Sequence, residues 1–165
     1  MTLRRGLLLA LLGAVVAGGV MVMWRLRAEN RRLAHRVLRE DALHAMNEGR
    51  HTDAAAAFRQ VVREAPGDAE AAYLGAREAD NANDYNNARE GYLQALRIDT
   101  RLGDARARLV ELTARNGVLD EARHHLNKLE EIFGPSEPRV IVLKARLAAP
   151  QANAARHPDA GADRH

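Results

Sequence analysis

Seven histidines and no cysteine limit the metal chemistry open to this chain, because a zinc site without thiolates depends on imidazole and carboxylate ligands. His124 and His125 are adjacent, so on a helix their side chains point about 100° apart and do not share a face. His44 and His51 flank a predicted turn, and no His-x-x-x-His pair with a helping carboxylate occurs. These spacings favour solvated histidines, and we expect neither a metal nor a cofactor.

The acidic run at residues 80–84 superficially resembles a calcium-binding loop. Asp80 and Asp84 bound it, but it lacks the glycine and the terminal bidentate glutamate that such a loop needs. Ser136 is the only serine, and the chain has no phosphate-cradling glycine loop and no nucleophile elbow. We therefore expect a protein that is not an enzyme.

Positive charge is concentrated near the N-terminus. The formal net charge is +3, but Arg4 and Arg5 contribute +2 and residues 25–39 contribute +5, so the chain from Glu40 onward carries −4. A nucleic-acid-binding protein places its positive charge on the folded domain. This distribution predicts that nucleic acid is not a partner.

An apolar segment runs from Gly6 to Trp24 without a single charged side chain. As a helix it would be about 28 Å long, close to the ~30 Å hydrocarbon thickness of a bilayer. The alternative is a cleaved signal peptide with Arg4 and Arg5 as its basic region, but the apolar run continues to Trp24. We predict an uncleaved transmembrane helix within residues 1–24.

Residues 25–34 form a predicted basic connector that could contact anionic lipids. Arginine outnumbers lysine 23 to 2, which is typical of a GC-rich bacterial genome, so the predicted location is the bacterial inner membrane. The arginines after the apolar segment favour the cytosolic side for the following domain, although a short, doubly basic N-terminus would favour export. Small residues recur every four positions along one face and could pair helices into a homo-oligomer: Gly6, Ala10, Ala14 and Gly18.

A fixed repeat interval organises the rest of the chain. Ala54, Ala88 and Ala122 follow one another at intervals of 34 residues. Phe58, Tyr92 and Leu126 keep the same interval of 34 residues. The pattern predicts paired helices at residues 36–48 and 53–64, 69–81 and 86–98, and 104–115 and 119–132. Left-handed turn residues are expected at Gly49, Asn83 and Gly117, the types that tolerate positive φ.

The interval and the alanine, aromatic-or-leucine and turn pattern resemble the tetratricopeptide-repeat (TPR) family. The resemblance implies an all-α fold, in which the transmembrane helix precedes a TPR α-solenoid of three helix–turn–helix repeats with a C-terminal capping helix. The expected TPR domain covers residues 35–149, with repeats at 35–68, 69–102 and 103–136 and the cap at 137–149. Residues 150–165 are expected to be disordered.

In TPR proteins the leading helix of each repeat lines a concave groove that accepts a peptide or a partner's helix. Carried over by register, the resemblance places these residues in the groove: Arg39, Leu43, Met46, Asn47, Glu70, Tyr73, Arg77, Asp80, Asn81, Asp104, Ala107, Glu111 and Arg115. Tyr73 and Arg77 form the expected hot spot, because aromatic residues and arginine dominate interface energetics.

The predicted function is a membrane-anchored protein-interaction scaffold that recruits or stabilises a protein partner in an envelope assembly or regulatory complex at the inner membrane. The alternative is a homo-oligomeric structural subunit of a membrane complex. The small-residue face of the N-terminal segment and stacking between repeats would then hold its copies together.

Overall fold

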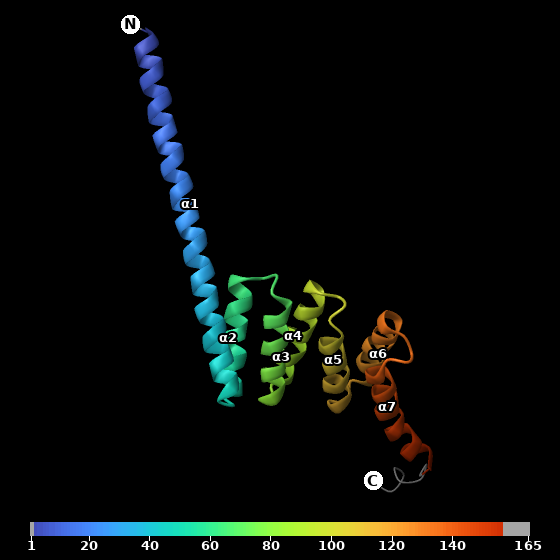
Figure 1. Ribbon diagram of the computed structural model, residues 1–165. Coiled ribbons are helices and arrows are strands. Elements are labelled where there is room, and N and C mark those ends of the chain that lie inside the picture. The colour runs from blue at the N-terminus through green and yellow to red at the C-terminus, as the bar shows by residue number, and fades with distance from the viewer. Residues whose placement is uncertain (1, 157–165) are drawn as a thin grey trace, which may run out of the picture.

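The computed structural model describes the backbone of residues 2–156 and the side chains of residues 18–27, 29–30 and 33–148. This part of the chain is helical and contains no strand. The helices are α1 (Thr2–Asn47), α2 (His51–Glu64), α3 (Ala69–Asn81), α4 (Tyr85–Ile98), α5 (Gly103–Arg115), α6 (Leu119–Phe133) and α7 (Pro138–Arg156). Successive helices pack side by side, and α1 extends far beyond them (Figure 1). The expected all-α architecture is confirmed.

Three equivalent turns join the helices of each pair. Gly49, Asn83 and Gly117 have φ angles of 71°, 59° and 78°, so the predicted left-handed positions are confirmed. In each turn the residue after the one with positive φ donates its backbone N–H to the carbonyl five positions earlier. Arg50, for example, donates to the Ala45 carbonyl at 3.0 Å. This bond closes the end of a helix whose last carbonyls would otherwise lack partners.

The periodic residues form the core between the helices. Ala54, Ala88 and Ala122 are fully buried, as are the aromatic rings of Phe58 and Tyr92. Small residues are needed where helices cross closely, and glycine serves the same purpose between α3 and its neighbours. A Cβ atom on Gly75 would lie 2.9 Å from Phe58 Cβ, and one on Gly91 would lie 2.8 Å from Ala76 Cβ. The sequence pattern predicted the alanines and missed both glycines.

The N-terminal helix α1 contains 46 residues, about 69 Å at 1.5 Å per residue. No helix in the described part of the chain is long and apolar enough to cross a membrane. The prediction of a single-pass protein in the inner membrane is therefore wrong, whereas the lipid contacts expected for residues 25–34 stay a prediction.

Of the small residues predicted to pair helices, the side chains of Gly6, Ala10 and Ala14 lie outside the described part. A Cβ atom on Gly18 would meet nothing within 4 Å.

The last helix, α7, packs against both α5 and α6. Val140 and Leu143 are buried and join Val110, Leu126 and Leu129 in a second core cluster, apart from the larger cluster that runs from α1 to α5. The helix continues to Arg156, beyond residue 150 where the sequence predicts the start of an irregular tail, and residues 157–165 lie outside the described part.

Candidate functional site

The leading helices α1, α3 and α5, continued by α7, contact one another through side chains on one surface, which we call the leading-helix face. Arg39 of α1 donates to Asp68 Oδ2 at 2.6 Å and to Glu70 Oε2 at 2.5 Å at the start of α3. Burial lowers the pKa of Arg39, but its hydrogen bonds and the charges of Glu70 and Asp68 outweigh that effect and raise it. The first predicted groove residue is therefore held as a cation.

The same kind of pair recurs from helix to helix along the face. Arg115 of α5 pairs with Asp80 of α3. Arg139 and Arg146, both of α7, lie 2.6 Å from Asp104 and 2.5 Å from Glu111 of α5, respectively. In all three pairs the arginine follows the acidic residue by 35 residues, one residue more than the repeat interval. Sequence analysis missed Arg139 and Arg146, although this shared spacing was available to find them.

Arg77, half of the predicted hot spot, is fixed from two sides. Its Nη2 atom lies 2.9 Å from Met46 Sδ of α1 and 3.2 Å from Glu78 Oε1. Glu78 is only 1% exposed, and its other oxygen lies 2.7 Å from His51 Nδ1 of α2. A buried carboxylate is retained only when it is paired, so the guanidinium of Arg77 helps to stabilise the fold. Sequence analysis missed this role of Glu78.

Tyr73, the other half of the hot spot, is half-buried beside Arg77. Its ring centroid lies 6.1 Å from that of Tyr92 in a tilted arrangement. Tyr73, Leu43 and Met46 all pack on the main core cluster while keeping part of their surface exposed. The face therefore combines a central apolar patch of these three residues with rows of charges that are already paired.

Three predicted groove residues have less defined surroundings. Asn47 and Asn81 are exposed at the ends of α1 and α3. Ala107 of α5 is half-buried and lines a small cavity of about 230 Å³ with Val142 and Leu143 of α7.

The histidines and acidic residues that could have bound a metal have other partners. His44 pairs with Glu48, and Asp84 accepts a hydrogen bond from the Asn87 backbone at the start of α4. His124 and His125 meet edge to face, with ring centroids 5.2 Å apart. Among the side chains that the structure describes, no three histidine or acidic residues converge as metal ligands would.

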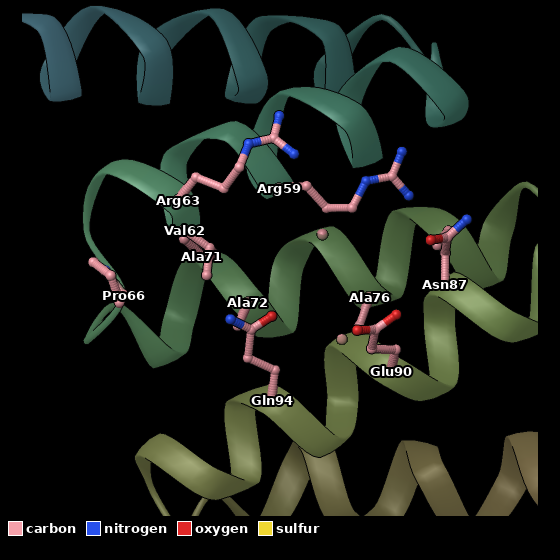
Figure 2. A pocket seen from close by; sticks show the side chains of 13 residues that line it. Arg59, Val62, Arg63, Pro66, Ala71, Ala72, Ala76, Asn87, Glu90 and Gln94 are labelled. Carbon is pink, nitrogen blue, oxygen red and sulfur yellow. The ribbon is translucent and has the colours of Figure 1, made fainter.

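A pocket of about 320 Å³ opens on the other side of α3 (Figure 2). Its base consists of alanines and glycines of α3 and α4, including Gly75, Ala76 and Gly91. Arg59 of α2 and Gln94 of α4 belong to its walls. Ala72, Gly75, Ala76 and Ala79 are separated on the helical wheel from Tyr73 and Arg77, so the pocket and the leading-helix face are distinct surfaces.

Solved structures with the same arrangement of helices include TPR domains. The second TPR domain of human RPAP3, in complex with an HSP70 peptide, matches with a TM-score of 0.60 and 16% identity, over 67% of this chain and 91% of that one. The Yersinia enterocolitica type III secretion chaperone SycD, in complex with a peptide of the translocator YopD, matches with a TM-score of 0.59 and 17% identity, over 75% and 94%. MamA matches with a TM-score of 0.65 and 19% identity, over 72% and 68%.

This chain has the TPR fold. No protein-family model matches the sequence, and no curated protein matches it at the significance required. Because the sequence identities are so low, these structural matches speak for the fold alone.

Proposed function

We propose that this protein is a non-enzymatic interaction scaffold that binds a peptide or a helix of a partner protein on the leading-helix face. The central apolar patch of Leu43, Met46 and Tyr73 carries the proposal. These side chains are only partly buried. Met46 Sδ lies 2.9 Å from the fixed guanidinium of Arg77, and Tyr73 lies one turn before Arg77 on α3. Aromatic and methionine side chains held next to arginine are typical of binding hot spots.

The ion pairs of the leading-helix face indicate which kind of side chain a partner would use to bind there. Arg39, Asp80 and Arg115 already have partners within the chain, so an incoming charge would have to displace an existing ion pair. Exposed ion pairs contribute little net energy, and exchanging one for another gains less still. We infer that an apolar side chain of the partner contacts the patch and that charged residues set its orientation. The RPAP3 and SycD structures, each in complex with a peptide, support this mode of binding by analogy of fold.

Affinity capture tests the proposal with two matched variants. Tyr73→Ala removes the aromatic ring of the patch, whereas Gln94→Ala removes a polar side chain from the pocket on the other side of α3. A partner should be recovered with the wild type and with Gln94→Ala and be depleted at least about tenfold with Tyr73→Ala, the loss expected for a hot spot. Circular dichroism at the assay temperature must show that all three proteins are folded, because Tyr73 packs on the core and its truncation lowers the melting temperature. Equal recovery with Tyr73→Ala would show that another surface binds.

A further inference from the structure

The outer half of α1 has nothing packed against it in the described part of the chain (Figure 1). The helix joins the body through Ala42 and Ala45, which are buried, and through the half-buried Leu38. From Val20 to Val37 its large apolar side chains that the structure describes are exposed, including Leu33 at 54% and Val37 at 56%. An exposed apolar stripe on a helix segment that packs against nothing else is typical of an interaction surface.

The exposed residues follow the spacing of a coiled coil. Met23, Leu26, Asn30, Leu33 and Val37 are separated by three, four, three and four residues, the alternation of a and d positions in a heptad. Residues of other faces are apolar before Trp24, but beyond it the remaining described faces carry mainly charged or small residues. The apolar surface therefore narrows to a single stripe after residue 24.

We propose that α1 pairs with α1 of a second copy of this chain as a short parallel coiled coil over residues 23–37. Leucine occupies both d positions, at Leu26 and Leu33, and the β-branched Val37 occupies an a position. That combination favours two strands. The remaining central position is Asn30, and a single asparagine at an a position selects a parallel, in-register dimer because its amide bonds the same amide of the partner helix.

Charge complementarity supports the same register. In a parallel pair each g residue faces the e residue five positions later on the other helix. Arg36 occupies a g position and Asp41 the matching e position, so each dimer would gain two Arg36–Asp41 pairs. Both residues are exposed, and within the described part of the chain neither makes an ion pair.

The apolar stripe lies on a different side of α1 from the residues that contact the repeat domain. At about 100° per residue, the line through Leu33 and Val37 lies roughly 130° around α1 from the line through Leu38, Ala42 and Ala45 that contacts the body. Two copies can therefore meet along α1 while their repeat domains stay apart. The leading-helix face of each copy remains accessible, so the dimer would present two binding faces, and this inference stands independently of the proposed function.

Because these 165 residues contain no cysteine, a single introduced thiol tests the proposal directly. Leu33→Cys places a thiol at the core of the proposed pair, and Arg25→Cys places one at an outward c position of the same helix. Under mild oxidation we expect Leu33→Cys to form a disulfide dimer at least tenfold faster than Arg25→Cys. Light scattering during gel filtration should give a dimer mass for the wild type and a monomer mass for Leu33→Arg, with an unchanged helical signal because Leu33 is exposed.

Three results would overturn the proposal. The wild type could have a monomer mass, or its dimer could persist in Leu33→Arg, which would move the contact to another surface. A dimer in which Leu33→Cys cross-links no faster than Arg25→Cys would exclude the parallel register, because an antiparallel pair centred on Asn30 separates the two thiols.

Discussion

Protonation of the buried His125 should lower the free energy of unfolding in mild acid, and substituting this one residue separates its effect from those of the other titrating groups. Its side chain lies within α6, and its Nδ1 atom is buried without a hydrogen-bond partner in the described part of the chain. The pKa of His125 is lowered to about 4, chiefly by burial. The charges of His124 and Arg106 also lower it, and that of Glu121, 3.7 Å away, raises it. The folded state therefore holds a neutral imidazole at pH values where the unfolded chain binds a proton.

The sign and size of the effect follow from linkage. An unfolded histidine has a pKa of about 6.5, so the unfolded state takes up the proton first as the pH falls. The stability contributed by the neutral imidazole is intact above pH 6.5 and is lost as the pH falls toward 4. At 1.36 kcal/mol per pKa unit the full loss is about 3 kcal/mol, of which about 2 kcal/mol is expected by pH 4.5.

Urea titrations at pH 7 and pH 4.5 provide the assay, with His125→Gln and His124→Gln compared with the wild type. His124 is exposed on the same helix and serves as the control. The wild type should lose about 2 kcal/mol more of its unfolding free energy than His125→Gln over this range. His124→Gln should also lose more than His125→Gln, but less than the wild type, because the charge of His124 contributes to the lowered pKa of His125. Equal pH dependence in His125→Gln would contradict the burial argument, since carboxylate titrations are common to all three proteins.

Three further substitutions and one control, Gly67→Ala, test the packing of the repeats by thermal or urea unfolding. Ala88→Arg should cost at least about 3 kcal/mol, because a charged chain cannot enter a fully buried helix crossing, and an unchanged melting temperature would refute the assigned register. Gly91→Val should cost about 1–3 kcal/mol because its Cβ would lie 2.8 Å from Ala76 Cβ, whereas Gly67→Ala, which meets nothing within 4 Å, should change stability by less than about 0.5 kcal/mol. Tyr92→Phe should be neutral or stabilising by up to about 1 kcal/mol, since the buried hydroxyl lacks a partner in the described residues; a loss above about 1 kcal/mol would reveal a hydrogen bond there.

The sequence predicted the helices, the turns and most of the core because those features repeat locally. Gly49, Asn83 and Gly117 recur at the repeat interval and have positive φ, so residue type and spacing were sufficient. The close approaches at Gly75 and Gly91 were not predictable, since they depend on where two helices cross. The burial of Glu78 likewise depends on His51 of the preceding helix reaching it.

The candidate site was predicted in part. The family register grouped Met46, Tyr73 and Arg77, which do lie together, but it could not show that Arg77 is held by Glu78 or that Asp80 is matched by Arg115. These pairings depend on the offset between successive leading helices, which is a property of the three-dimensional stack. The membrane prediction failed for a different reason, because it rested on the hydropathy of the N-terminal segment alone, and the described helices include none that could span a bilayer.

Site-specific photo-crosslinking tests the central claim, that the leading-helix face binds a protein partner, most directly. A benzophenone side chain would replace Asn81, exposed at the end of α3, or Gln94, in the pocket on the other side of that helix. Neither substitution disturbs a buried residue. Binding on this face predicts a cross-linked partner from position 81 that is lost when Tyr73→Ala is added, and none from position 94. A partner cross-linked from position 94 alone, or one from position 81 that is insensitive to Tyr73→Ala, would contradict it.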